Sequence, residues 1–374
     1  MKQVRLLFVL TSPVRGGVEE VVLALLRRLD PGEFPLALAA PQPLLDALAP
    51  DLSGVAVETT GAAPESWRAI TQVRQLAGFI RHFRPDVVNP HLFRSVLVAA
   101  PLARVCRVPA VVETYHGREA WRQGPLSGRF AVDRLVARFV DRVIAVSAAA
   151  RDFLVHGKGY PAGKVVVVPN GRDLSVYAPG GSRDAVRKEL GLDRHTPLVG
   201  VFGRLEAQKG HTYLLDAWPA VVRARPDARL LLVGDGSLRA PLEAQARAAG
   251  VAASVLFAGF RADVPRLLDA MDVVALPSLH EGMPLTVIEA AAAARPVVAT
   301  AVDGTVEVVR DRETGRLVSP ADPAALSHTL VELLSHPEHA AAMGRAARAF
   351  AMERFGVDRQ VEATARIYRE VAAR

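Results

Sequence analysis

The sequence contains a single cysteine, Cys106, in 374 residues. One thiol excludes an internal disulfide and any cysteine-rich metal cluster. Long apolar runs are also missing, since none approaches the roughly 18 residues that suggest a membrane-spanning helix. The short apolar run at residues 6–10 is too brief for an export signal and fits a buried first strand. We therefore expect a cytoplasmic protein without a membrane span.

Aromatic residues and paired acidic motifs are scarce as well. Aromatic side chains make up 6% of the chain, which leaves few platforms for stacking bases, and no nucleic-acid recognition motif is present. We therefore expect no nucleic-acid partner.

The chain has no Asp-x-Asp pair of the kind that holds a divalent cation on a diphosphate, so we expect no metal cofactor.

The net charge of +7 is unevenly distributed along the chain. Residues 1–176 contain 22 Lys and Arg against 15 Asp and Glu, whereas the remaining residues contain 24 of each kind. This excess favours an anionic partner for the first half, such as membrane lipid or a phosphorylated acceptor. A solvated surface in an arginine-rich chain is the alternative explanation.

Buried strand-like runs alternate with helical patterns along the whole chain. Continuous Val and Leu runs, rather than strict alternation, predict parallel strands covered on both faces, and the length predicts two domains. We therefore predict an α/β fold with two doubly wound, Rossmann-like parallel sheets. The predicted strands are residues 5–10, 36–40, 86–89, 110–114, 142–146, 165–168, 198–202, 229–233, 255–258, 273–276 and 297–299. The predicted helices are residues 18–29, 67–83, 129–139, 212–223, 237–249, 264–269 and 285–294.

Proline, glycine and serine cluster between the strand at 165–168 and Ser182, as in an exposed linker. We therefore predict a first domain at residues 1–176 and a second at 183–357. The tail at 358–374 has a helical pattern, and one hypothesis is that it crosses back to the first domain.

Glu281 and Glu289 bracket the start of an alanine-rich helix. Glu281 follows the strand at 273–276, and ligands of open parallel sheets bind at the carboxyl ends of strands. Glu289 lies about one helical turn further on. Two carboxylates facing one crevice suit hydroxyl-rich ligands such as sugars and ribose. A solvated acid and a helix-start glutamate favoured by the helix dipole are the alternative.

Three loops after predicted strands could hold phosphate. Gly16 and Gly17 join the first strand to a helix, where backbone amides can receive an anion, although the spacing lacks the Gly-x-Gly-x-x-Gly of dehydrogenases. Arg204 and Lys209 follow the strand at 198–202 and form a suitable pair for a diphosphate. Lysine is rare here, at 5 against 41 arginines, so Lys209 stands out. The third loop, residues 234–236, could admit a base or ribose, or be a plain turn.

Two histidines, His91 and His116, stand at the ends of neighbouring predicted strands. A lone histidine is more often structural than catalytic. Two at adjacent strand tips favour a polar pocket near the Gly16-Gly17 turn.

Taken together, these motifs resemble those of the retaining nucleotide-sugar glycosyltransferases of family 4, the glycosyl transferases group 1. The resemblance runs nearly end to end and implies the GT-B fold, in which two Rossmann-like domains face each other across a cleft. The matching segments are residues 16–19, 91, 114–117, 145–147, 169–173, 203–204, 209–210, 234–236, 281–284 and 289–290.

The resemblance also implies roles for individual residues. Arg204 and Lys209 would bind the donor diphosphate, Glu281 would lie near the donor sugar, and His116 would assist at the reacting centre. Glu289 would accept hydrogen bonds from the ribose. The remaining residues implied to bind the donor or border it are Gly16, Gly17, Gly203, Gly234, Gly236, Gly282, Met283, Pro284 and Leu285.

The implied activity is transfer of a hexosyl unit, with retention and without a metal, from a UDP- or GDP-sugar to a glycan or lipid-linked acceptor. Such a reaction belongs to polysaccharide synthesis for the cell envelope. A nucleotide-sugar epimerase of the same architecture and a non-catalytic nucleotide-sugar-binding protein are the alternatives.

Arg134, Arg138 and Arg142 are spaced by four, so one helix could place all three against anionic lipid at the inner membrane face. An ordinary amphipathic core helix is the competing explanation.

Overall fold

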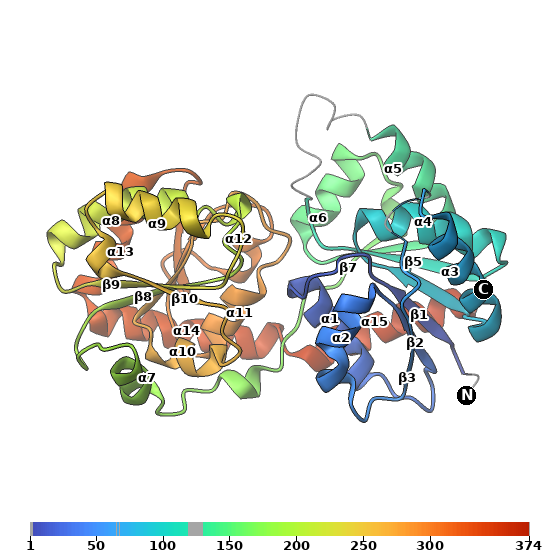
Figure 1. The fold of residues 1–374 in the computed structure, drawn as a ribbon, viewed down its shortest axis with the longest axis horizontal. Coiled ribbons are helices and arrows are strands. Elements are labelled where there is room, and N and C mark those ends of the chain that lie inside the picture. The colour runs from blue at the N-terminus through green and yellow to red at the C-terminus, as the bar shows by residue number, and fades with distance from the viewer. Residues whose placement is uncertain (1–2, 65, 67, 119–129, 374) are drawn as a thin grey trace. The chain divides into compact units, whose positions relative to one another are not determined.

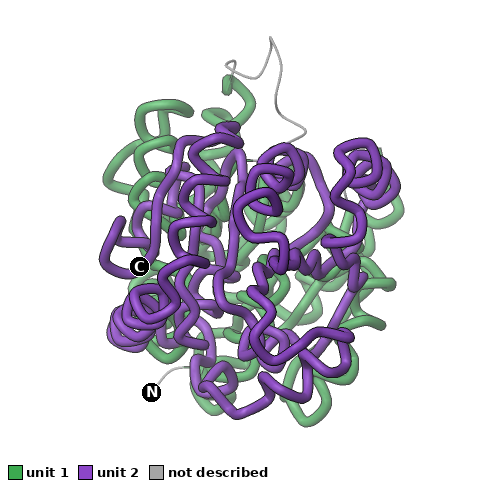
Figure 2. The backbone as a smooth tube through the Cα atoms, turned by 90° about the vertical axis from the view of Figure 1, so that its left-hand side faces the viewer, with its two compact units in different colours: residues 1–171, 357–374 green, residues 172–356 purple. Residues whose placement is uncertain are grey.

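A computed structural model of the protein describes residues 3–64, 66, 68–118 and 130–373. The chain divides into two compact units, coloured separately in Figure 2. The first consists of Met1–Gly171 and Val357–Arg374, and the second of Arg172–Gly356. Residues 172–176, which the sequence analysis assigned to the first domain, therefore lie in the second unit. The predicted class, two Rossmann-like α/β units with parallel sheets, is confirmed.

The first unit contains a seven-stranded sheet in the order β3-β2-β1-β4-β5-β6-β7, with every pairing parallel (Figure 1). Neighbouring residues of β1 enter different cores, with Leu6 and Phe8 on one face and Leu7 and Val9 on the other. This two-sided burial explains the continuous apolar runs. The strands are β1 (Leu6–Val9), β2 (Leu36–Ala39), β3 (Val57–Thr60), β4 (Val87–Pro90), β5 (Ala110–Tyr115), β6 (Arg142–Ala145) and β7 (Val165–Val167).

Helices cover both faces of this sheet. The core with Leu6 and Phe8 includes residues of α1 (Gly17–Arg28), α2 (Gln42–Leu52) and α15 (Val357–Ala372). The tail helix therefore packs within the first unit, where Tyr368 is fully buried. The other face carries α3 (Ile70–Phe83), α4 (Leu92–Val105), α5 (Ala131–Val136), a 3-10 turn (Ala137–Phe139), α6 (Ala148–Asp152) and a π-helical turn (Phe153–Gly157).

Two helix predictions in the first unit need correction. The predicted helices at 67–83 and 129–139 each start at a residue outside the described part of the chain. In the described part of the first, residues 68 and 69 precede the helix, since α3 begins at Ile70. The described part of the second is short, because α5 ends at Val136 and the 3-10 turn ends at Phe139. Arg142 belongs to β6 and pairs with Glu370 at 2.8 Å. Arg134, Arg138 and Arg142 thus do not share one helix, and the predicted cationic helix side is wrong.

The second unit contains a six-stranded parallel sheet in the order β10-β9-β8-β11-β12-β13. Its strands are β8 (Leu198–Phe202), β9 (Arg229–Val233), β10 (Val255–Gly259), β11 (Val273–Leu276), β12 (Val297–Thr300) and β13 (Gly315–Val318). Its helices are α7 (Arg183–Glu189), α8 (His211–Ala224), α9 (Arg239–Ala248), α10 (Val264–Ala270), α11 (Leu285–Ala292), α12 (Thr305–Val308), α13 (Pro323–Ser335) and α14 (Pro337–Arg354). Within the described residues, no helix combines the length and apolar character needed to cross a membrane.

Each sheet has one topological switch point, where the order in which successive strands are added changes from one side of the sheet to the other. In the first unit this point lies between β1 and β4, and in the second between β8 and β11. Loops at the carboxyl ends of two such strands diverge and leave a crevice, which is where open α/β sheets bind ligands. The Gly16-Gly17 turn and His91 follow the first pair of strands, and the loops bearing Lys209 and Glu281 follow the second.

Candidate functional site

Lys209 and Glu281 come from the two loops at the switch point of the second sheet. The Lys209 ammonium lies 2.6 Å from Glu281 Oε1, and the Ser278 hydroxyl donates to the same oxygen at 2.7 Å. The side chains of Lys209 and Glu281 are 18% and 7% exposed, so the pair is largely desolvated. The sequence analysis placed both residues at a donor site without expecting them to touch.

Gln208 links the same two loops through its backbone and its side chain. Its carbonyl accepts from the Leu279 amide at 2.8 Å, and its side-chain amide donates to the His280 carbonyl at 2.9 Å. Gly210 lies so close to the other loop that a Cβ there would sit 2.0 Å from the Pro277 carbonyl oxygen. Glycine at this position is therefore required by packing, and its φ of 66° also favours glycine.

The loop 281–284 leads directly into α11, whose first turn has no side-chain cap. Pro284 occupies the capping position, and proline has no group that can accept from the helix amides. Uncapped amides and the positive end of the helix dipole are suited to an anionic group. Met283 is buried, while Gly282 and Leu285 are partly exposed beside this helix start.

Arg204 provides an exposed guanidinium in the loop after β8. No carboxylate of the described residues forms an ion pair with it, in contrast to Lys209. The loop after β8 therefore carries two cations: Lys209, which is ion-paired with Glu281, and Arg204, whose guanidinium is exposed. A diphosphate is the ligand that such a pair, beside a helix start, is chemically suited to bind.

Gly203, Gly234 and Gly236 pack two loops of the second unit together. A Cβ on Gly234 would lie 2.0 Å from the Gly203 carbonyl oxygen, and one on Gly236 would lie 2.6 Å from the Leu205 carbonyl oxygen. Gly203 itself has a φ of 154°. These contacts give the glycines a packing role, whereas the donor contacts expected from the sequence stay predictions.

Glu289, expected to bind ribose, lies in α11 and forms an ion pair with Arg172 at 2.7 Å. Arg172 also donates to the Tyr177 hydroxyl at 2.9 Å, and Tyr177 is hydrogen-bonded to Glu289. Burial, reinforced by the charge of Glu289, raises the pKa of Tyr177. A carboxylate has about four lone-pair sites, so ribose hydroxyls can still bind to it. Sequence reasoning gave Arg172 no role, because it lies in what reads as a linker.

In the first unit, Gly16 precedes α1 and Gly17 is its first residue, again without a side-chain cap. The buried side chain of Glu19 lies beside this turn, and a Cβ on Gly16 would sit 3.3 Å from its Oε2. A carboxylate at this position suits a hydroxyl-bearing ligand better than a lone phosphate. The expectation that this turn borders the substrates stays a prediction.

The two histidines of the first unit lie together, as expected for neighbouring strand ends. Nδ1 of His91 is 2.8 Å from Nε2 of His116, and the two ring planes are inclined by 25° with centroids 5.1 Å apart. Burial, with a smaller contribution from His116, lowers the pKa of His91 well below its ordinary value. Burial lowers the pKa of His116 to about 3. Both imidazoles are therefore neutral at physiological pH.

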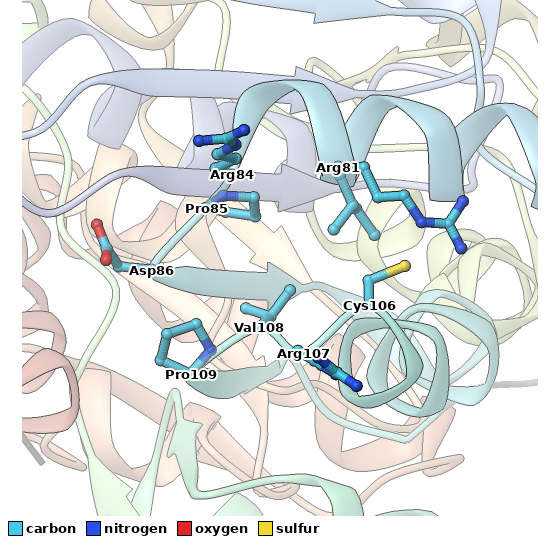
Figure 3. Close-up of a pocket in the computed structure, with 9 residues that line it drawn as sticks. Arg81, Arg84, Pro85, Asp86, Cys106, Arg107, Val108 and Pro109 are labelled. Atoms are coloured by element: carbon cyan, nitrogen blue, oxygen red, sulfur yellow. The ribbon is translucent and has the colours of Figure 1, made fainter.

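A surface hollow of about 350 Å³ lies elsewhere in the first unit (Figure 3). Its residues precede β4 and β5, so it sits at the amino ends of strands whose carboxyl ends carry His91 and His116. The hollow is thus separate from the candidate site. Its lining residues are Ile80, Arg81, Arg84, Pro85, Asp86, Cys106, Arg107, Val108 and Pro109. No group of three or more His, Cys, Asp or Glu within the described ranges could hold a metal ion.

Two family models match most of the chain. Residues 15–176 match Glycosyltransferase Family 4, and residues 196–336 match Glycosyl transferases group 1. Together they include the Gly-Gly turn, both histidines, Arg204, Lys209 and the two glutamates.

Known relatives agree with this assignment. The chain is 26% identical over 340 residues to an Escherichia coli UDP-Gal:alpha-D-GlcNAc-diphosphoundecaprenol alpha-1,3-galactosyltransferase, covering 88% of each chain. It is 33% identical over 315 residues to the alpha-maltose-1-phosphate synthase of Mycolicibacterium smegmatis, covering 77% of this chain and 79% of the relative. Its fold matches the crystal structure of Anabaena HepE in complex with UDP and glucose with a TM-score of 0.86 at 24% identity, over 98% of this chain and 100% of HepE. The chain therefore belongs to family 4 of the glycosyltransferases and is a nucleotide-sugar-dependent enzyme with the GT-B fold.

Proposed function

We propose that this enzyme transfers a hexosyl unit from a UDP-sugar to a hydroxyl of a glycan or lipid-linked acceptor, with retention and without a metal. The observation that carries the proposal is the contact between Lys209 and Glu281 at the switch point of the second sheet. The loop of Glu281 leads into the uncapped start of α11, and the loop of Lys209 also carries the exposed Arg204. Lys209, Arg204 and the start of α11 supply positive charge or amide donors suited to a diphosphate.

In the proposed reaction, the bond between the anomeric carbon and the diphosphate oxygen breaks, and that oxygen keeps the electron pair. A new bond forms between the same carbon and the acceptor hydroxyl oxygen, whose proton is released. Negative charge grows on the departing diphosphate, so fixed cations nearby lower the barrier. Lys209 and Arg204 are the residues we assign to this task.

Glu281 and Glu289 are assigned to the sugar and the ribose of the donor. Both carboxylates are buried and already accept hydrogen bonds, Glu281 from Ser278 and Glu289 from Arg172. A carboxylate that is held in this way is pre-oriented for a hydroxyl, because little motion is left to freeze on binding. His116, neutral and next to His91, is assigned to the transferred sugar.

Two similar proteins support UDP as the donor nucleotide, although a Corynebacterium glutamicum relative, 32% identical, is a GDP-mannose-dependent mannosyltransferase. HepE was solved with UDP and glucose, and the Escherichia coli relative is described as using UDP-Gal and a diphosphoundecaprenol-linked acceptor. A lipid-linked acceptor is consistent with the net positive charge of residues 1–176 and with a cytoplasmic protein that visits the inner membrane face. Pelleting with anionic liposomes at low salt tests whether the protein binds such a membrane, and failure to pellet with them would rule out membrane contact.

A panel of nucleotide sugars in a thermal-shift assay tests the donor assignment. Binding to the folded state raises the melting temperature, because a ligand at 100 times its Kd adds roughly 2.7 kcal/mol to the free energy of unfolding. We expect UDP-hexoses to raise it more than GDP-hexoses, and Lys209→Ala to weaken the shift. Equal shifts from both nucleotides would contradict the UDP assignment.

Product analysis separates the proposed function from its alternatives. A transferase releases UDP only when an acceptor is present and forms a new glycosidic bond. An epimerase would return an altered nucleotide sugar without an acceptor, and a binding protein would leave the donor unchanged.

A further inference from the structure

A buried chain of hydrogen bonds in the first unit ends at His116, and the side chain of Asn89 is at its centre. Asn89 is fully buried at the end of β4. Its amide nitrogen donates to the Val112 carbonyl oxygen and, at 3.0 Å, to the Thr114 hydroxyl. Its amide oxygen accepts from the Tyr368 hydroxyl at 2.6 Å and lies 3.2 Å from Nε2 of His91.

The orientation of the Asn89 amide follows from the Val112 carbonyl. A backbone carbonyl oxygen only accepts hydrogen bonds, so the amide group facing Val112 must be the NH₂. The oxygen then faces Tyr368 and His91. An amide oxygen also only accepts, so Nε2 of His91 must carry a hydrogen.

The hydrogen on Nε2 of His91 determines the tautomers of His91 and His116. A neutral imidazole carries one N–H, so His91 protonated at Nε2 has a bare Nδ1 that can only accept. Nδ1 of His91 lies 2.8 Å from Nε2 of His116, which must therefore be the donor. Since His116 is also neutral, its own Nδ1 carries no hydrogen. No other described residue is hydrogen-bonded to that Nδ1.

We propose that Asn89 is a positioning residue that fixes His91 and His116 as Nε2–H tautomers, so that Nδ1 of His116 is held as a hydrogen-bond acceptor for a sugar or acceptor hydroxyl. The role toward a hydroxyl rests on the proposed function, whereas the tautomers follow from the hydrogen bonds between two neutral rings. A neutral ring with a bare Nδ1 orients a hydroxyl by accepting from it. It has no proton to give to a leaving group through that atom.

Nitrogen-15 NMR of the histidine rings in the full-length protein tests the tautomers without any substrate. The resonances of the two rings are identified from their loss in His91→Gln and His116→Gln. At neutral pH we expect both rings to show protonated Nε2 and bare Nδ1. A His116 ring protonated at Nδ1 in the native protein would overturn the proposal, and this measurement needs no further variant.

Asn89→Asp tests the positioning role. An ionised carboxylate beside Nε2 of His91 stabilises the doubly protonated ring, which takes its second proton from solvent and then donates from Nδ1 to His116. His116 must in turn become an acceptor at Nε2 and move its hydrogen to Nδ1. We expect the NMR signature of His116 to reverse and the transfer rate to fall about tenfold or more, in line with loss of one hydrogen bond to the reacting group.

Tyr368→Phe is the matched control, because it removes another hydrogen bond to the same Asn89 oxygen and leaves the Val112 contact in place. We expect unchanged tautomers in this variant. A tautomer reversed by Asn89→Asp with an unchanged transfer rate would overturn the positioning role and remove His116 from the proposed site. Unreversed tautomers in folded Asn89→Asp, at a pH where carbon-13 NMR shows the introduced carboxyl group to be ionised, would overturn the effect of residue 89 on the two rings, whichever nucleotide sugar is the donor.

Discussion

Replacing Lys209 with alanine tests whether this ammonium stabilises the departing diphosphate or only neutralises Glu281. The structure makes both roles possible, because the two side chains are in contact at 2.6 Å. A simple loss of activity would not distinguish them. The experiment therefore needs Lys209→Ala, Glu281→Gln and the double variant as a cycle.

The stability of Lys209→Ala follows from the burial of the pair. Removing Lys209 leaves the Glu281 carboxylate, only 7% exposed, with Ser278 as its remaining side-chain donor among the described residues. Breaking a buried pair typically costs about 3–5 kcal/mol, and the lower end applies here because Lys209 is 18% exposed. About 3 kcal/mol corresponds to a fall of roughly 6–12 °C in melting temperature for a domain of this size. Glu281→Gln in the same background should recover most of this loss.

The rate should behave differently from the stability. Losing one cation at a developing oxyanion costs about 3 kcal/mol of barrier, or roughly 150-fold in kcat. The assay is UDP release in the presence of acceptor, with differential scanning calorimetry on the same samples. We expect the double variant to be roughly 150-fold slower than Glu281→Gln alone.

One outcome would refute this reasoning about the leaving group. If the double variant is as fast as Glu281→Gln alone, Lys209 serves only to neutralise the carboxylate. Lys188→Ala is the matched control, because Lys188 is an exposed lysine of α7 in the same unit. It should change neither the rate nor the melting temperature.

Three further predictions concern stability. Burial, with a smaller contribution from Lys209, lowers the pKa of His211 to about 4, so the unfolded chain binds more protons below its ordinary pKa and stability falls as pH drops through this range. His211→Phe should remove up to about 1.4 kcal/mol per pH unit of that slope, measured by urea unfolding at several pH values, and an unchanged slope would contradict it. Gly210→Ala should cost several times more than Gly250→Ala, because both have positive φ but only Gly210 faces a backbone oxygen, and equal urea midpoints would contradict this. A fragment of residues 1–171, which lacks α15, should be unfolded by circular dichroism, since α15 completes the core of the first unit, and a cooperative melt of this fragment would argue against it.

The sequence predicts all of the central strands and two of the four edge strands, β7 and β10. Runs such as residues 198–202, 229–233 and 273–276 coincide with β8, β9 and β11, because burial on both faces demands continuous apolar residues. The two strands that were missed, β3 and β13, lie at sheet edges and are partly exposed. Val57–Thr60 contains a single apolar residue, so no apolar run marks it.

The candidate site was predictable where it depends on topology and not where it depends on distant contacts. His91 and His116 follow adjacent strands, so their contact could be expected from the strand order. The pairing of Lys209 with Glu281 joins residues 72 positions apart, and nothing local indicates it. Arg172 was missed because its partner Glu289 is remote in sequence and its own surroundings resemble a linker.

Cys106, the only cysteine of the chain, lines the arginine-bordered hollow at the amino ends of β4 and β5. Burial, opposed by the nearby charge of Arg81, raises the pKa of its thiol, so maleimide coupling should proceed faster in mildly alkaline buffer. A fluorophore or spin label attached there would occupy the end of the sheet away from the histidine pair. The native enzyme thus already carries a unique attachment point for spectroscopic probes, with no competing thiol to remove.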